Sequence, residues 1–193
     1  RYRSLLSILF LVTTLACSFG REEGAPPPAA APSTAESTRK YLLEQIDDAS
    51  VIQLYADQFA ALPLREKTLV WHLSRAALAG RDIFYDQKHR NALEMRRVLE
   101  AILSHPQGVD PATLAELQRY TKLFWLNTGP YNNLTARKFV LQISPPALAA
   151  AAKASASAGA SFPTQANESV DQLLTRLGPM FFDPNVDPSV TNK

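Results

Sequence analysis

Residues 120–140 read YTKLFWLNTGPYNNLTARKFV, and this stretch carries most of what the sequence predicts about the fold. Its first third is apolar and aromatic, which is typical of the end of a core helix. A polar loop of amide side chains, Thr, Gly, Pro and Tyr follows over residues 127–133. Gly, Pro and Asn favour turns because each tolerates or imposes a backbone conformation that other residues avoid. We therefore expect a helix that ends in a loop shaped to meet a ligand or another part of the protein.

Three helices are predicted before this loop. Residues 64–79 place apolar side chains near helical spacing over about five turns, at roughly 3.6 residues per turn. Gly80 marks a break, because Gly in a helix interior costs about 1 kcal/mol relative to Ala. Residues 92–103 form an amphipathic stripe. Asp110 and Pro111 then open another helix, with Asp as the N-cap and Pro at the first helical position.

The remaining segments are shorter or less apolar. Residues 51–55 are rich in strand formers and predict a short strand. Residues 170–177 predict a last helix, which Gly178 and Pro179 are expected to close. Ala, Ser and Lys dominate residues 147–165, which we expect to be an Ala/Ser-rich surface insertion because they carry too little apolar bulk to anchor themselves. The predicted fold class is predominantly α with a minor β contribution (α+β).

Size and charge narrow the function classes. The chain has 193 residues, which is enough for one domain with a sizeable core. Its formal net charge of +2 gives no basic surface of the kind that binds nucleic acid. The single cysteine allows no internal disulfide. The chain begins with Arg1 rather than Met and ends at Lys193 without an obvious closing element, so we expect both ends to be cuts.

The first residues resemble a targeting segment. Two arginines precede an apolar run over residues 5–12, and residues 15–17 read LAC. This order is typical of a secretory signal peptide, and LAC resembles the end of a bacterial lipobox, in which the thiol of Cys17 is acylated. A plain signal peptide that happens to contain a cysteine is the alternative. We expect residues 1–17 to be a lipoprotein signal peptide and residues 18–39 a disordered Pro/Ala/Ser-rich tether. The expected location is therefore the bacterial cell envelope, where the protein would be lipid-anchored on the periplasmic or outer-membrane side.

Few residues have the spacing that catalysis or metal binding requires. The histidines His72, His89 and His105 do not lie at the close spacing of a zinc site, so no metal ligand is predicted from them. The sequence contains neither a Gly-x-Ser-x-Gly elbow nor a phosphate-binding loop. Phe139 is the best single candidate for ligand contact, with ordinary core packing as the alternative. For Asn127, capping of the preceding helix or support of the turn is the alternative, and it is the commoner role of Asn.

Several segments together resemble the dipeptidyl peptidase III family of zinc peptidases. These segments are LVWHLSRAA at 69–77, GRDIFYDQ at 80–87, NTG at 127–129 and KFV at 138–140. Their order and spacing agree with the N-terminal part of the family. The similarity covers about residues 41–186, with the Ala/Ser-rich stretch as an interruption. The resemblance implies a two-lobed peptidase, of which residues 40–193 would form an incomplete, helical N-terminal lobe.

The resemblance also implies where the chemistry belongs. In the family, zinc is held on the other lobe by a His-Glu-(three residues)-His motif and a second Glu further on. The glutamate of the motif is the general base toward the zinc-bound water, which attacks the scissile carbonyl. Neither element occurs in this sequence. Zinc is therefore expected in the full-length protein, in a missing C-terminal catalytic portion, and this chain alone is expected to bind none and to be inactive.

The N-terminal lobe of the family helps to bind the N-terminal end of the peptide substrate. The phenylalanine of its Lys-Phe-Val-Pro segment lines the pocket for the second residue before the cut, and Phe139 matches that phenylalanine. Leu141 stands where the family has Pro. Asn127, Gly129 and Tyr131 match an Asn-x-Gly-x-Tyr pattern, and the resemblance implies that they line the cleft.

Two functions follow from these observations. The first is the N-terminal portion of a lipid-anchored, zinc-dependent dipeptidyl peptidase that releases dipeptides from the N-terminus of short peptides. The second is a non-catalytic peptide-binding or structural lipoprotein. A His-Glu-(three residues)-His motif encoded downstream of Lys193 would favour the first, and a natural stop codon there would favour the second.

Overall fold

A computed structural model describes residues 39–191 of the chain. The chain divides into two units, Arg1–Arg39 and Lys40–Lys193, and the described helices and strands belong to the second. The predicted signal peptide, the predicted lipidation site at Cys17 and nearly all of the predicted tether lie outside the described residues.

A β-hairpin comes first in the described chain. Strands β1 (Leu42–Ile46) and β2 (Ala49–Ile52) pair antiparallel, with Asp47 and Asp48 in the turn between them. Asp47 has a positive φ of 52°, a conformation that Asp tolerates better than most residues and that two-residue hairpin turns require. The sequence predicted one strand here and placed it a few residues late, because Asp-Asp is a weak turn signal.

Two helices follow a short 3₁₀ segment, η1 (Asp57–Ala61). They are α1 (Leu64–Ala79) and α2 (Arg81–Lys88), so the predicted helix at this position is confirmed. Gly80 separates them, as predicted, with an ordinary right-handed φ of −82°. None of the residues of α1 is buried, whereas α2 buries Tyr85. The two helices therefore differ in how they relate to the core.

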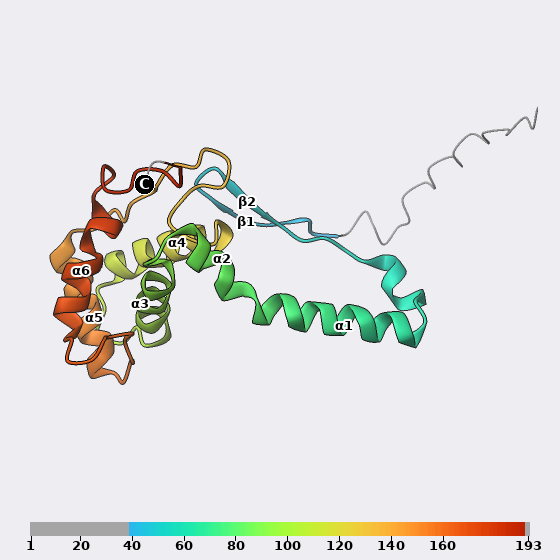
Figure 1. Ribbon diagram of the computed structural model, residues 1–193, viewed down its shortest axis with the longest axis horizontal. Helices are drawn as coiled ribbons and strands as arrows, with labels where there is room; N and C mark the ends of the chain where they lie inside the picture. The colour runs from blue at the N-terminus through green and yellow to red at the C-terminus, as the bar shows by residue number, and fades with distance from the viewer. Residues whose placement is uncertain (1–38, 192–193) are drawn as a thin grey trace, which may run out of the picture. The chain divides into compact units, whose positions relative to one another are not determined.

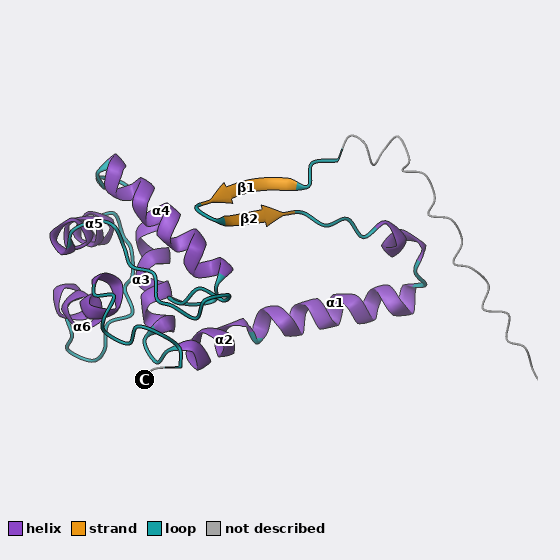
Figure 2. Ribbon diagram, turned by 90° about the horizontal axis from the view of Figure 1, so that it is seen from above, coloured by secondary structure: helices purple, strands orange, loops and turns teal. Residues whose placement is uncertain are grey.

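The core lies among four helices, α3 (Ala92–Ser104), α4 (Pro111–Leu126), α5 (Pro145–Ser157) and α6 (Val170–Phe182). Figures 1 and 2 show them gathered together, with α3 against α4 and α5, and α5 against α6. Complete burial of one large apolar side chain contributes about 1.5–3 kcal/mol, so their shared cluster is the main source of stability. Its largest fully buried side chains are Tyr120, Tyr131, Phe124, Phe181, Met95, Leu99, Ile102, Leu117, Leu148, Leu173, Leu177 and Val98.

Side-chain caps mark where α4 and α6 begin. Asp110 accepts a hydrogen bond from the backbone N–H of Thr113 at 2.9 Å, and Pro follows in the first turn, as predicted. The same hydrogen bond lowers the pKa of the Asp110 carboxyl. Ser169 and Gln172 form a reciprocal capping box at the start of α6, with contacts of 3.2 and 2.8 Å. Each cap satisfies a backbone donor that the helix leaves unpaired and contributes about 1 kcal/mol.

The expectation that residues 147–165 form a surface insertion is wrong for their helical part. Leu148, Ala151, Ala152 and Ser155 lie on one face of α5, and none of them is more than 2% exposed. Their spacing of i, i+3, i+4 and i+7 makes a continuous stripe. Small side chains let α5 approach α3 and α4 closely, so the helix joins a dense core with Leu148 as its one buried large apolar residue. Composition alone does not reveal this burial, because three of the four buried side chains of the helix are small.

The expectation that α6 ends at Gly178 and Pro179 is also wrong, because the helix continues to Phe182. Pro in a helix interior removes a backbone donor and costs about 3 kcal/mol. Met180 and Phe181, just beyond it, are only 2% and 0% exposed. Burial of two large apolar side chains contributes a comparable or larger amount. Packing against the core therefore outweighs the local breaker signal.

The described chain is mostly helical and has one two-stranded antiparallel sheet. This confirms the predicted fold class, predominantly α with a minor β contribution. Among the described helices, none has the length and apolar character needed to span a bilayer.

Ala152→Leu should lower the free energy of unfolding by about 1–3 kcal/mol, because the Ala152 side chain is fully buried and the added atoms overpack the core. Ala156→Leu, on the exposed face of the same helix, is the matched control and should change it by less than about 0.5 kcal/mol. Chemical denaturation of both variants measures the difference. Equal effects of the two substitutions would contradict the packing described for α5.

Candidate functional site

Asn127 begins the loop of residues 127–139, which we call the Phe139 loop. Its side-chain Nδ2 donates to the carbonyl of Leu123 at 2.9 Å, at the end of α4. Its Oδ1 accepts the backbone N–H of Asn133 at 2.9 Å. Both ends of the amide are therefore used, and the residue is only 9% exposed. Asn127 caps the helix and ties the start of the loop to its tip, as the alternative from the sequence proposed.

Gly129 lies against the end of α2. It has a φ of 144°, and a Cβ built on it would lie 3.3 Å from Cβ of Lys88, so both the backbone and the available space favour Gly. The Lys88 ammonium donates to the carbonyl of Asn127 at 3.1 Å and to the side-chain oxygen of Asn133. Burial lowers the pKa of Lys88. This lysine connects α2 to both ends of the turn.

Tyr131 is fully buried beneath the loop. Its hydroxyl donates to the backbone carbonyl of Asp187 at 3.1 Å, and its backbone forms an isolated antiparallel bridge with Lys138. Burial raises the pKa of Tyr131 to about 12, so the hydroxyl stays protonated at neutral pH and acts as a donor. The ring therefore holds the loop on the bundle while its hydroxyl holds a distant segment.

That distant segment is residues 186–190, which we call the C-terminal strap. The backbone N–H of Lys138 donates to the carbonyl of Pro188 at 2.9 Å, and the N–H of Val190 donates to the carbonyl of Ala136 at 3.1 Å. The Lys138 ammonium also donates to the first carbonyl of the strap, and burial lowers the pKa of this lysine. The strap thus adds a short antiparallel partner to the Phe139 loop.

His89 fixes the strap from the end of α2. Its Nδ1 accepts the backbone N–H of Asn91 at 3.1 Å, so Nε2 carries the proton. Nε2 lies 3.0 Å from Oδ2 of Asp187 and donates to it. This hydrogen bond lowers the pKa of the Asp187 carboxyl. His89 is only 3% exposed, so the contact is shielded from water on the histidine side.

Phe139 differs from the other three predicted contacts because its side chain is only half-buried. Its backbone N–H donates to the carbonyl of Pro130 at 3.0 Å. Its ring packs edge-on against Tyr120, with 5.3 Å between the ring centroids. One side of the ring rests on the core and the rest can meet a ligand.

The structure brings the four predicted contacts into one loop and gives them different roles. Asn127, Gly129 and Tyr131 are buried and hold the shape of the loop. Cleft lining by these three stays a prediction. Phe139 is partly exposed and also packs against the core, so both interpretations from the sequence, ligand contact and core packing, have a physical basis.

Sequence reasoning missed the residues that hold the loop from outside. Lys88 and His89 contact it from α2, and Asp187 contacts it through the strap. No short motif links them, because they are brought together only by the fold. The positive φ of Asp187, 45°, is likewise not visible in the sequence.

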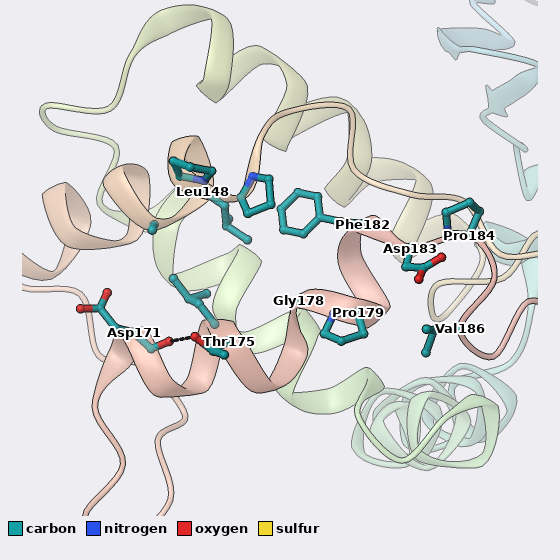
Figure 3. A pocket seen from close by; sticks show the side chains of 13 residues that line it. Leu148, Asp171, Thr175, Gly178, Pro179, Phe182, Asp183, Pro184 and Val186 are labelled. Atoms are coloured by element: carbon teal, nitrogen blue, oxygen red, sulfur yellow. Dashed lines mark hydrogen bonds between the residues drawn. The ribbon is translucent and has the colours of Figure 1, made fainter.

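A separate apolar groove of about 750 Å³ lies between α5 and α6 (Figure 3). Leu148 and Phe182 contribute to its apolar lining, and its acidic residues are Asp171 and Asp183. The hydroxyl of Thr175 is already used, because it donates to the carbonyl of Asp171 at 2.8 Å. The groove suits an apolar chain segment, and none of the four predicted contacts lines it.

The three histidines belong to different elements. His72 lies in α1, and the other two follow α2 and α3. In the part of the chain that the structure describes, no three His, Cys, Asp or Glu side chains come together as possible metal ligands.

No protein-family model matches the chain, and a search of curated proteins finds no match. The family resemblance therefore depends on the motifs at residues 69–87 and 127–140 themselves.

Asp187→Asn should loosen the C-terminal strap while the bundle stays folded, because the amide lacks the charge that the His89 Nε2–H meets. We expect faster hydrogen exchange of the Val190 and Lys138 amides, which donate in the ladder, with the amides of α4 unchanged. Asp171→Asn is the matched control, since Asp171 is exposed at the start of α6 and its carbonyl accepts a hydrogen bond from Thr175 of the same helix.

The same variant gives a pH dependence of known sign. The His89 hydrogen bond lowers the folded-state pKa of Asp187 below its ordinary value of 3.8, so its contribution is complete above that pH and is lost as the pH falls through the folded-state pKa. As the pH falls through this acidic range, the protection of the Val190 amide, which is the slowing of its exchange relative to that of an unstructured chain at the same pH, should decrease in the unmodified chain. The Asp187→Asn variant should lack that step. Identical exchange in the two proteins at neutral pH would contradict the role of the pair.

Proposed function

We propose that this chain is the N-terminal portion of a zinc-dependent dipeptidyl peptidase that releases dipeptides from the N-terminus of short peptides. The observation that carries the proposal is the ordered set of motifs similar to the dipeptidyl peptidase III family, which ends in KFV at 138–140. The ring of Phe139 is half-buried, and its loop is hydrogen-bonded to α2 and to the C-terminal strap. A positioned apolar ring of this kind suits the side chain of a bound peptide.

Substrate binding and catalysis would belong to different parts of the full-length protein. Activation of the attacking water by zinc would be the task of a C-terminal catalytic portion that carries the His-Glu-(three residues)-His motif. The residues of this chain would bind the N-terminal end of the peptide and orient it. The chain by itself would then bind peptide without cleaving it.

The proposal also includes a lipid anchor. An apolar run followed by LAC at residues 15–17 supports acylation of Cys17, which would hold the protein at the bacterial cell envelope. Labelled palmitate should enter the unmodified protein in a bacterial host and should not enter Cys17→Ser. Equal labelling of the two would contradict the anchor.

The full-length protein tests the peptidase proposal. It should release dipeptides from short peptides with a free N-terminus, and removal of zinc by a chelator should abolish turnover until zinc is restored. In that protein, Phe139→Ala should lower kcat/KM by about 10- to 200-fold, because one apolar contact with the substrate contributes roughly 1–3 kcal/mol. Absence of zinc-dependent dipeptide release would favour the second function, a non-catalytic lipoprotein.

Phe162→Ala is the matched control for the Phe139 substitution. Phe162 is also half-buried against the core, but it lies outside the Phe139 loop. Its removal should leave kcat/KM unchanged, although it removes an aromatic ring of the same size. If Phe139→Ala instead leaves turnover unchanged and costs the roughly 3–5 kcal/mol expected of a buried Phe, then Phe139 is a core residue.

A further inference from the structure

Most of the exposed large apolar side chains of the described residues lie between Tyr41 and Phe84. From Tyr85 to residue 191, those exposed are Trp125, Leu126 and Leu134. The bundle therefore covers most of its own apolar surface. The hairpin, η1, α1 and the start of α2 leave most of their apolar side chains exposed, with Ile46 as a buried exception.

α1 exposes apolar side chains on opposite sides. Side chains two residues apart on a helix point about 200° apart, since one turn takes roughly 3.6 residues. Trp71 and Leu73 are two residues apart and are 58% and 59% exposed. Leu64 and Leu78 lie on the Trp71 side and are 79% and 64% exposed, and Val70 lies on the Leu73 side. A helix that is apolar around its whole circumference is typical of a helix buried on all sides.

The charges on α1 do not suit a helix in water. From residue 68 to Ala79 the sequence has one arginine, Arg75, and no Lys, Asp or Glu. The Arg75 guanidinium lies over the ring of Trp71, 5.8 Å from its centroid, rather than on a separate polar face. Solvent-exposed helices normally carry charges along one face. This part of α1 therefore lacks the charged face that a solvent-exposed helix normally has.

The hairpin is also open on both faces. β1 exposes every residue except Ile46, so side chains on both of its faces are open. A bulge at Leu43 interrupts the alternation, because Leu42 pairs with Ile52 and Glu44 with Val51, and Leu42 and Leu43 are 50% and 45% exposed. A two-stranded hairpin is marginal by itself and normally needs a third strand or a packed layer. Its turn end is held to the bundle through buried Ile46 and through the Glu44–Lys122 and Asp47–Arg119 ion pairs.

We propose that α1 and the hairpin form the docking surface for the C-terminal catalytic portion of the same protein, which packs on both sides of α1 and covers both faces of the hairpin. This inference rests on the proposed function for the identity of the partner. A membrane surface would cover one side of α1 and leave the other in water. A two-fold pairing of α1 with its own copy would also cover one side only. The two-sided exposure therefore favours a folded polypeptide that surrounds the helix.

Hydrogen exchange on this chain and on the full-length protein tests the docking surface. The amides of α1 should exchange at least about 100-fold more slowly in the full-length protein, because packing on both sides suppresses local opening. The amides of α3 should differ little between the two, because the bundle is closed in either case. Equal exchange of α1 in both proteins would overturn the proposal.

Two substitutions test both sides of the helix separately. Trp71→Gln and Leu73→Gln should each lower the melting temperature of the full-length protein and leave that of this chain unchanged. Leu134→Gln, which replaces a side chain that is 95% exposed outside this surface, should change neither. An effect of only one of the two α1 substitutions would overturn two-sided packing.

The other possible covers give different results. Concentration-dependent protection of α1 in this chain, with a dimeric mass in solution, would assign the surface to a second copy and overturn the proposal. Protection that requires vesicles of anionic phospholipid would assign it to a membrane and also overturn it. Protection of α1 in a full-length protein without zinc-dependent turnover would uphold the docking surface and reject only the proposed function.

Discussion

The burial of Tyr120 is the contact on which the rest of the bundle depends. Its ring, which comes from α4, lies within 5.3–6.1 Å of the ring centroids of Phe124, Phe139 and Phe181. Such aromatic pairs contribute about 0.5–1.5 kcal/mol each beyond the burial of their area. The Tyr120 hydroxyl is buried with no hydrogen-bond partner among the described residues, which costs about 1–3 kcal/mol. The surrounding apolar contacts must outweigh that cost, and they connect α4, α6 and the Phe139 loop through one side chain.

The course of the chain around Tyr120 follows from this contact. α6 continues past Pro179 because Phe181 reaches the aromatic cluster only if the helix does not stop. The N–H of Leu141 then donates to the carbonyl of Phe181 at 2.8 Å, which brings the chain after the Phe139 loop against the end of α6. The C-terminal strap begins a few residues later and reaches the loop from there. The position of Phe139 is therefore set by the core and by the strap together.

The hairpin and α1 are attached to the bundle by weaker interactions. Their contacts with the bundle include the Glu44–Lys122 and Asp47–Arg119 ion pairs, and partly exposed pairs of this kind contribute about 0–1 kcal/mol each. An isolated helix of this length is marginal in water, and most helical stability comes from packing of its apolar residues. A folded polypeptide around α1 would supply that packing. The bundle can thus position the Phe139 loop by itself, whereas α1 and the hairpin suit a role in joining it to another part of the protein.

The sequence by itself determined the helical class, the break at Gly80 and the start of α4 at Asp110 and Pro111. Each of these signals acts within a few residues, so it can be read along the chain. The resemblance to a known family singled out the four predicted substrate contacts in the Phe139 loop, but it could not tell the half-buried ring of Phe139 from the three buried residues that hold the loop in shape. Only the tertiary structure decided that the Ala-rich α5 is a core helix and that Asp187 meets His89. The former depends on how closely neighbouring helices approach. The contact between Asp187 and His89 depends on residues far apart in the chain. No pattern along the sequence encodes how closely two helices approach or which distant residues meet.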